Sequence, residues 1–169
     1  MQPPFRPPFR YTLKLAKSDF KFSVAHFTLF GPVYAEPLHG HNYRVAVEVA
    51  GAELEDEGLL IETGVLKRRV RELCEELDDR VLLPELSPYL QFEAEEGSLE
   101  CRYAERVYRF PEREVLLLPV VNVTMEQLAT LLWRRLADDL AAPGILHLAV
   151  EVEETDGQSV RVEAPLSRG

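Results

Sequence analysis

The sequence is short of cysteine and of basic charge, and each shortage argues against a class of protein. Two cysteines among 169 residues are too few for a disulfide framework, and Cys74 and Cys101 are too far apart for a metal-binding pair. Cys74 follows a helical apolar pattern, so we expect a buried thiol there. The net charge of −10 argues against a surface that binds nucleic acid or an anionic membrane.

Long apolar runs are also lacking, and no stretch of about 18 apolar residues predicts a membrane-spanning helix. The first residues do not have the charged and then apolar pattern of a secretory signal, so we expect a cytoplasmic protein. With 46% hydrophobic and 28% charged residues, the chain has the composition and length of one domain with a real core.

The clearest chemical pattern is Glu-Pro-Leu-His-Gly-His-Asn-Tyr at residues 36–43. Residues 41–49 alternate between apolar and polar, which predicts a strand with one apolar face. If the extended backbone begins at His39, the imidazoles of His39 and His41 point to the same side. Two imidazoles at the edge of an apolar face are suited to a metal whose other ligands come from elsewhere.

His26 is the candidate for the third ligand. Phe20, Phe22, Val24 and His26 share one face of an alternating stretch, and a buried imidazole needs a polar partner. A hairpin between this stretch and the histidine strand would bring the three imidazoles together. Three neutral imidazoles leave one tetrahedral position open, as in a catalytic zinc site. The alternative is that the three are unrelated core or surface histidines.

These motifs resemble the 6-pyruvoyl-tetrahydropterin synthases and the 6-carboxy-tetrahydropterin synthases. The shared motifs, in the family's order, are Phe-Ser-Val-Ala-His at 22–26, His-Gly-His-Asn-Tyr at 39–43, Gly-Leu-Leu-Ile-Glu at 58–62, Leu-Asp-Asp at 77–79, Asn-Val-Thr-Met-Glu at 122–126 and Val-Glu-Glu-Thr at 152–155. The resemblance implies a tunnelling fold whose protomers form a homo-oligomer, a trimer or hexamer, with active sites between subunits.

The order of predicted elements is strand, strand, helix, inserted strands, helix, strand, strand. This order predicts an α+β domain with two helices packed on one face of an antiparallel sheet. The first helix should run from Thr63 to about residue 78, and the second should begin at the capping box of Thr124 and Gln127 and end at Pro143. Residues 1–10 are expected to be a flexible proline-rich arm before a single domain at 11–169, with a β ribbon inserted at about 85–118.

The resemblance also implies a zinc-dependent lyase that acts on 7,8-dihydroneopterin triphosphate or a related dihydropterin. Zn²⁺ held by the three histidines would act as a Lewis acid on the side chain of the substrate. Glu154 matches the family's pterin anchor and lies on the apolar parity of its strand, where a carboxylate needs a partner. Thr124 and Glu126 match the family's Thr-x-Glu near the pterin, although a helix cap and a first-turn carboxylate explain them equally well.

Two positions depart from the family's common pattern. The common members have a catalytic cysteine in the loop before the histidine motif, whereas no cysteine lies between residues 26 and 39. Glu36, three residues before His39, resembles the branch that cleaves the substrate to release 6-hydroxymethyl-dihydropterin. Asp79 stands where the family has the histidine of a catalytic Asp-His dyad. Asp78 and Asp79 are therefore candidates for an acid or base, because adjacent carboxylates raise each other's pKa; the alternative is a helix end paired with Arg80.

The sequence motifs are compatible with several functions. The first is the lyase just described, with 6-hydroxymethyl-dihydropterin as the favoured product. A second is a non-catalytic pterin-binding or structural homologue, or a 6-carboxy-tetrahydropterin synthase of 7-deazaguanine (queuosine) biosynthesis. A third is a zinc hydratase or hydrolase with an unrelated substrate. In each case the expected partner is a small molecule and not a nucleic acid or a membrane.

Overall fold

The structure is a computed structural model that describes residues 9–140 and 144–166. Its strands are β1 (Tyr11–Leu15), β2 (Lys21–His26), β3 (His39–Gly51), β4 (Arg80–Pro84), β5 (Gln91–Glu95), β6 (Ser98–Tyr103), β7 (Arg106–Pro111), β8 (Val115–Leu118), β9 (Ile145–Thr155) and β10 (Gln158–Pro165). The helices are α1 (Thr63–Leu77) and α2 (Met125–Asp139). Most of the predicted proline-rich arm, and Pro143, lie outside the described residues.

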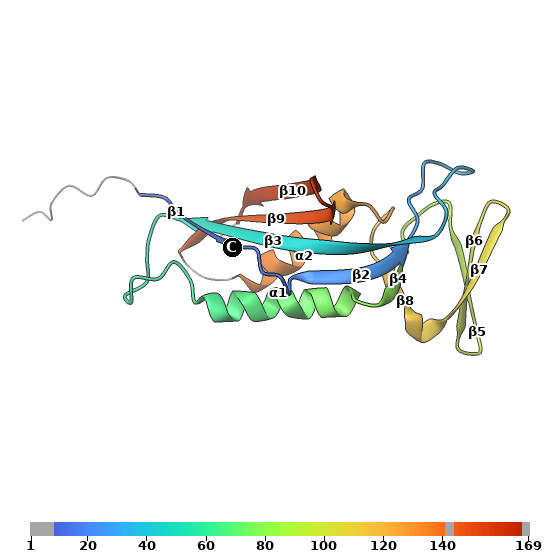
Figure 1. The fold of residues 1–169 in the computed structure, drawn as a ribbon, viewed down its shortest axis with the longest axis horizontal. Helices are drawn as coiled ribbons and strands as arrows, with labels where there is room; N and C mark the ends of the chain where they lie inside the picture. The colour runs from blue at the N-terminus through green and yellow to red at the C-terminus, as the bar shows by residue number, and fades with distance from the viewer. Residues whose placement is uncertain (1–8, 141–143, 167–169) are drawn as a thin grey trace, which may run out of the picture.

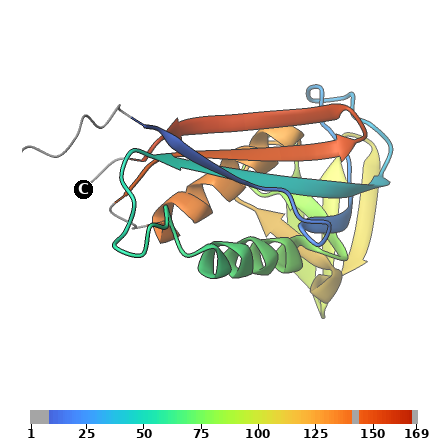
Figure 2. The same ribbon diagram turned by 60° about the vertical axis from the view of Figure 1, so that its left-hand side comes forward.

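The main sheet has seven strands in the order β10–β9–β3–β2–β4–β8, with β1 also paired to β3. The long strand β3 is central, because its first half pairs with β2 and its second half with β1, both antiparallel. Both helices lie on one face of this sheet (Figure 1, Figure 2). The predicted α+β class, with two helices on one face, is therefore confirmed.

Two strands join the main sheet in a direction that the sequence did not indicate. β4 pairs parallel with β2, and β8 pairs parallel with β4, whereas an antiparallel sheet was predicted throughout. β4 begins only three residues after the end of α1, and its last three residues are all buried. A short and continuously apolar strand of this kind shows no alternation, so periodicity cannot reveal it.

The helices bury the stripes that their spacing predicts. Leu66, Val70, Leu73, Cys74 and Leu77 are the buried residues of α1, and they pack into the main core with the apolar face of the sheet. Burial raises the pKa of the Cys74 thiol to about 12, as expected for an unreactive core cysteine. Within the described ranges, neither helix has the length and apolar character needed to cross a membrane.

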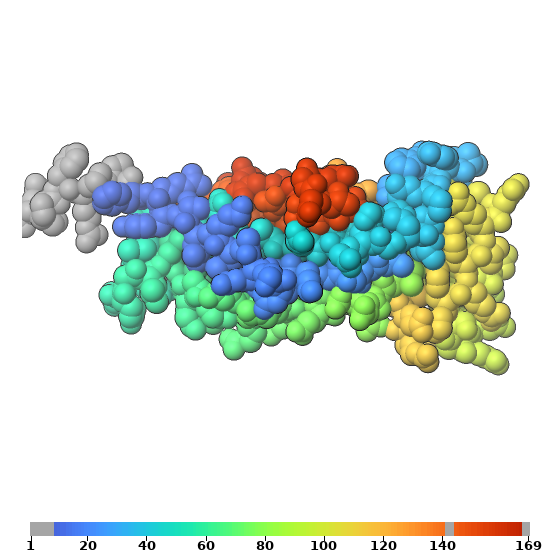
Figure 3. Space-filling model, in the orientation of Figure 1, coloured from blue at the N-terminus to red at the C-terminus, as the bar shows by residue number. Residues whose placement is uncertain are grey.

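The inserted residues form a second sheet, β5–β6–β7, at one end of the molecule (Figure 1). It spans residues 91–111 and is shorter than the predicted ribbon of about 85–118, because β8 belongs to the main sheet. One face of the inserted sheet packs against the segment 27–38 that joins β2 to β3, and the space-filling view shows the two in contact (Figure 3). The insertion therefore lies next to the segment that carries Glu36.

Candidate metal and substrate site

The pairing of β2 with β3 brings the three predicted histidines together. His26 at the end of β2 is the direct partner of His39 at the start of β3, and His41 lies opposite Val24. One ring nitrogen from each of the three imidazoles lies within 4.8 Å of the others. Nitrogen ligands of a tetrahedral zinc lie roughly 3.3 Å from one another. The observed spacing, with His39 Nε2 and His41 Nε2 2.9 Å apart, therefore fits a small metal ion.

Backbone carbonyls orient two of these rings. Nδ1 of His26 lies 3.2 Å from the Val123 carbonyl oxygen, and Nδ1 of His39 lies 2.8 Å from that of Pro37. With a proton on Nδ1, each ring donates to its carbonyl and keeps the lone pair on Nε2 for a metal, which is the usual arrangement behind ligating histidines. Burial, together with His39 and His41, lowers the pKa of His26, which favours the neutral form that a metal requires.

Glu154 lies beside the triad and finds its partner in Tyr43. The Tyr43 hydroxyl donates to Glu154 Oε1 at 2.7 Å, and the same hydroxyl is 3.1 Å from His26 Nε2. Glu154 Oε1 is also 3.4 Å from His41 Nε2. Burial and the Glu154 carboxylate raise the pKa of Tyr43, so its hydroxyl remains a donor. The sequence pattern placed Tyr43 on the apolar face of its strand but did not predict its hydrogen bond to Glu154. A tyrosine on a buried face could have indicated such a bond, because a buried phenol needs a polar partner.

Glu36 lies at the edge of the triad, with Oε2 3.9 Å from His39 Nε2. The same oxygen accepts a hydrogen bond from the Thr28 amide at 3.1 Å. Burial raises the pKa of Glu36, but the hydrogen bonds from Thr28 and the neighbouring His39 and His26 outweigh it and leave the pKa below its ordinary value. Glu36 is thus a carboxylate at neutral pH and has the protonation state of a base.

The two adjacent aspartates at the end of α1 have different surroundings. Asp78 Oδ1 accepts a hydrogen bond from the Ser23 amide at 2.6 Å, while the Asp79 amide donates to the Ser23 carbonyl at 2.8 Å. These bonds fasten the helix end to β2. Asp79 has a φ of +55°, and it lines a cavity of about 770 Å³ that is also bordered by His41 and Glu154. Arg80 donates to the Arg113 carbonyl, and among the described residues no hydrogen bond or ion pair joins its side chain to Asp78 or Asp79, so the predicted alternative of a helix end paired with Arg80 is not seen.

Thr124 and Glu126 are predicted site residues whose polar contacts, in the described chain, are made within α2 and not with the triad. Thr124 is the N-cap of α2, and its hydroxyl accepts from the Gln127 amide at 3.4 Å. Glu126 is exposed in the first turn. In the described part of the chain, no hydrogen bond or ion pair links either residue to the histidines; the nearest connection is Val123, whose carbonyl holds His26.

Comparison with known proteins agrees with this fold and site. Residues 15–165 match the family described as 6-pyruvoyl tetrahydropterin synthase. A protein of Methanocaldococcus jannaschii, provisionally named a 6-carboxy-5,6,7,8-tetrahydropterin synthase, is 31% identical over 83% of this chain and 86% of its own length. The chain belongs to the 6-pyruvoyl tetrahydropterin synthase family.

Solved structures give the same result for the fold. The crystal structure of 6-pyruvoyl tetrahydropterin synthase from Plasmodium vivax superposes with a TM-score of 0.87 at 26% identity, covering 93% of this chain and 99% of that one. Structures of the same parasite enzyme in which a catalytic glutamate is replaced by alanine or by cysteine match equally well, at 25% identity. The tunnelling fold implied by the sequence motifs is therefore confirmed.

Proposed function

We propose that this chain is a zinc-dependent lyase that acts on 7,8-dihydroneopterin triphosphate or a related dihydropterin. The observation that carries the proposal is the convergence of the His26, His39 and His41 imidazoles between two carboxylates, Glu36 and Glu154. The three imidazoles would hold zinc through neutral nitrogens, and the bound metal would supply Lewis-acid chemistry toward oxygen atoms of the substrate side chain. The donor set consists of the ligand types that zinc prefers.

The carboxylates would have different tasks because their surroundings differ. Glu154 has 16% of its side chain exposed and borders the cavity, so it would bind the amidine-like edge of a pterin through two charged hydrogen bonds. Tyr43 would hold Glu154 in place through its hydroxyl. Glu36 is ionised and partly exposed, so it would take a proton from a substrate hydroxyl as a general base. Asp79, which lines the cavity, would be the second acid or base, whereas Asp78 is engaged with Ser23.

The favoured product is 6-hydroxymethyl-dihydropterin, formed by a retro-aldol type cleavage that begins with loss of a hydroxyl proton. Glu36 in place of the family's cysteine supports this route, since a carboxylate base suits an acidified hydroxyl. The Plasmodium vivax relative also has a catalytic glutamate. The archaeal relative's name favours a second candidate, the 6-carboxy product.

The active protein would be a homo-oligomer, a trimer or hexamer, with Thr124 and Glu126 meeting the pterin of a neighbouring subunit. Within the described chain, neither residue has a hydrogen bond or ion pair to the three histidines, which supports this arrangement. Light scattering of the zinc-loaded protein would give the number of subunits, and a monomer would exclude the shared site.

Turnover of dihydroneopterin triphosphate by the zinc-loaded protein, with products identified by fluorescence and mass, tests the function. We expect 6-hydroxymethyl-dihydropterin from the wild type. Glu36→Gln should lose turnover by roughly 10²–10⁴-fold, because general base catalysis contributes about that much. Zinc content should be unchanged, and Glu36→Cys should shift products toward the pyruvoyl compound.

The control is Glu57→Gln, in an exposed stretch before α1, which should react like the wild type. A 6-carboxy product from the wild type would select the second candidate, and tight pterin binding without turnover would select a non-catalytic homologue. A fully active Glu36→Gln variant would remove Glu36 from the chemistry.

A further inference from the structure

Glu36 lies on a small hairpin within the segment that joins β2 to β3. Leu29 and Ala35 form an isolated antiparallel bridge. The Glu36 amide donates to the Thr28 carbonyl at 3.0 Å, and the Thr28 amide donates back to the Glu36 carboxylate at 3.1 Å. The position of the carboxylate relative to the histidines therefore depends on how this hairpin is held.

Side chains from other parts of the chain form hydrogen bonds to the backbone of both strands of the hairpin. On the first strand, the side-chain amide of Asn122 makes two hydrogen bonds to Leu29. Its Oδ1 accepts from the Leu29 N–H at 3.0 Å, and its Nδ2 donates to the Leu29 carbonyl at 2.9 Å. On the second strand, Arg106 donates from Nη1 to the Glu36 carbonyl at 2.7 Å and from Nη2 to the Ala35 carbonyl at 3.0 Å. These two carbonyls belong to the peptide groups before and after the Glu36 Cα. The planar guanidinium thus fixes both peptide planes on which the direction of the Glu36 side chain depends.

The inserted sheet holds Arg106 in turn. Arg106 is paired with Tyr103 across the β6–β7 turn, and its guanidinium carbon lies 5.9 Å from the centre of the Tyr103 ring. Tyr103 is 1% exposed, and its hydroxyl donates to the Gly31 carbonyl at 2.7 Å. The tip of this turn therefore makes three hydrogen bonds to the backbone of the Glu36 hairpin.

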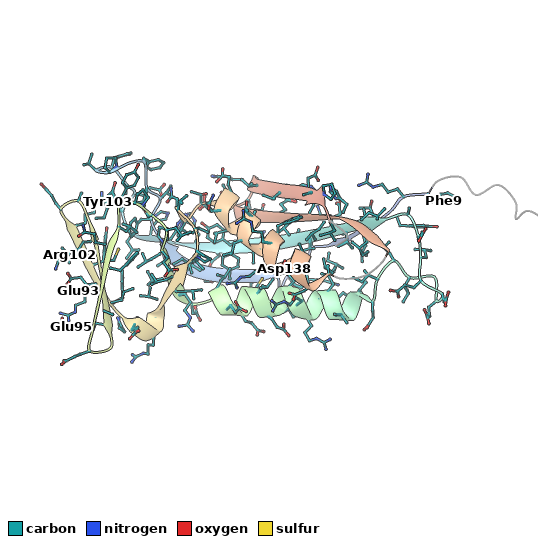
Figure 4. All side chains as sticks on the ribbon, turned by 180° about the vertical axis from the view of Figure 1, so that it is seen from behind. Phe9, Glu93, Glu95, Arg102, Tyr103 and Asp138 are labelled. Atoms are coloured by element: carbon teal, nitrogen blue, oxygen red, sulfur yellow. The ribbon has the colours of Figure 1, made fainter. Side chains whose placement is uncertain are left out.

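Apolar packing adds to these bonds. Phe27, Leu29 and Ala35 of the hairpin segment share a buried cluster with residues of the inserted sheet, namely Leu99, Cys101 and Tyr103. The Phe27 ring stacks on Tyr108 at 5.3 Å. In the view from behind, Tyr103 lies toward the hairpin, whereas Glu93, Glu95 and Arg102 lie on the outer side of the sheet (Figure 4). The insertion thus has an inner face that supports the hairpin and a solvated outer face.

We propose that Arg106 is a positioning residue that aims the Glu36 carboxylate at the histidine site, and that the inserted sheet serves to hold it. The proposal rests on the function assigned above, since it treats Glu36 as the base. Arg106 makes no contact with the histidines in the described chain; it acts on the backbone of Glu36. A displacement of about 1 Å at a reacting group can lower a rate by roughly 10²-fold.

The test compares Arg106→Met with Arg109→Met, a matched control from the same strand whose guanidinium binds Glu95 within the inserted sheet. Arg106→Met should lower kcat by roughly 10–100-fold, with the KM for the pterin and the zinc content unchanged. Arg109→Met should match the wild type. Arg106→Lys should recover part of kcat, because an ammonium can bind one of the two carbonyls but not both as a fork.

Hydrogen–deuterium exchange supplies a readout that needs no substrate. The amides of Thr28 and Glu36 should exchange faster in Arg106→Met than in the wild type or Arg109→Met, while those of α2 stay unchanged. If the wild type turns over no pterin, the proposed function fails, and exchange alone decides whether Arg106 holds the Glu36 segment.

Three results would overturn the proposal: unchanged exchange in Arg106→Met, unchanged kcat in an active enzyme, or equal losses in the Arg109→Met control. If Arg106→Met does not fold, Tyr103→Phe removes a single bond to the hairpin, at Gly31. Like Arg106→Met, Tyr103→Phe should lower kcat and leave KM unchanged. A kcat and an exchange rate equal to those of the wild type would count against the proposal.

Discussion

The Glu154 carboxylate lies close to one phenol and two imidazoles, so its negative charge interacts with three neighbouring side chains. Tyr43 donates to it, and His26 Nε2 and His41 Nε2 lie 3.7 and 3.4 Å away. A carboxylate in this position is needed to bind a cationic or amidine-like group, while the tyrosine hydrogen bond alone would be satisfied by a neutral amide. Charge and hydrogen bonding at Glu154 can therefore be separated experimentally.

Glu154→Gln should weaken pterin binding and leave zinc binding intact. The amide oxygen can still accept from Tyr43, but one charged hydrogen bond to the pterin edge is lost, which costs about 1.5–3 kcal/mol, or roughly 10–150-fold in Kd. Calorimetric titration with a pterin such as biopterin measures the loss. Glu153→Gln, one residue earlier on the opposite face of β9, is the matched control and should bind normally. Equal affinities for wild type and Glu154→Gln would show that Glu154 is only a strand end.

The clustering of His26, His39 and His41 was predictable because strand alternation and hairpin pairing are local rules, and they place the three imidazoles together. Tyr43, Asn122 and Arg106 were not found, since each acts on a residue distant in sequence. Arg106 acts on the Glu36 backbone 70 positions away. An alternating pattern reports which face a residue occupies, but it carries no information on what that face packs against.

At the scale of elements, the alternating pattern predicted β2, β3 and β9 correctly, and each of these strands has buried residues. Only two strands were predicted before the first helix, whereas three are present, because the first predicted strand is divided into β1 and β2, which pair with different halves of β3. β4 escaped prediction because its buried run has no alternation, and its parallel pairing depends on the path of α1 across the sheet. The inserted sheet was predicted from alternation, yet its boundary with β8 was not, since both are short extended runs.

The solvated face of the main sheet includes a charged contact that spans its strands. Arg161 on β10 donates to both oxygens of Glu48 on β3, at 2.7 and 3.4 Å, and to Glu163. Arg161 lowers the pKa of Glu48 below its ordinary value of 4.5, and this interaction outweighs the opposing effect of burial. β9 separates these two strands, so the pair links the edge strand to the centre of the sheet.

Glu48→Gln should lower the free energy of unfolding at pH 7 by about 0.5–1 kcal/mol, the upper range for a partly exposed ion pair. Because the folded pKa of Glu48 is depressed, the contribution is present above pH 4.5 and disappears as pH falls through the lower folded value. Urea unfolding at pH 7 and pH 3 should therefore show a difference from wild type only at pH 7. Glu93→Gln, whose carboxylate is 72% exposed on the inserted sheet, is the control and should change little. A difference that persists at pH 3 would contradict the ion pair as its cause.

At the scale of the whole molecule, the triad lies where four parts of the chain meet. His26 and the other two histidines come from β2 and β3, Val123 stands just before α2, and Glu154 is near the end of β9. The segment 27–38 then joins this point to the inserted sheet. A metal ion bound at the triad would thus be bound only by the folded chain, so zinc affinity and global stability should be linked.

Removal and return of zinc should shift the thermal unfolding of the whole chain. At free zinc of about 100 times Kd, the folded state gains about 2.7 kcal/mol, which is roughly 5–10 °C in Tm for a chain of this size. Calorimetry of chelator-treated protein, before and after zinc is added, measures the shift. His39→Ala and His41→Ala should fold, because both side chains are partly exposed, but should lose bound zinc and the zinc-dependent shift. His147→Ala, on β9 outside the triad, should keep both. Full zinc occupancy in His39→Ala, or a wild-type Tm that does not change when zinc is added, would show that the three imidazoles do not form the metal site.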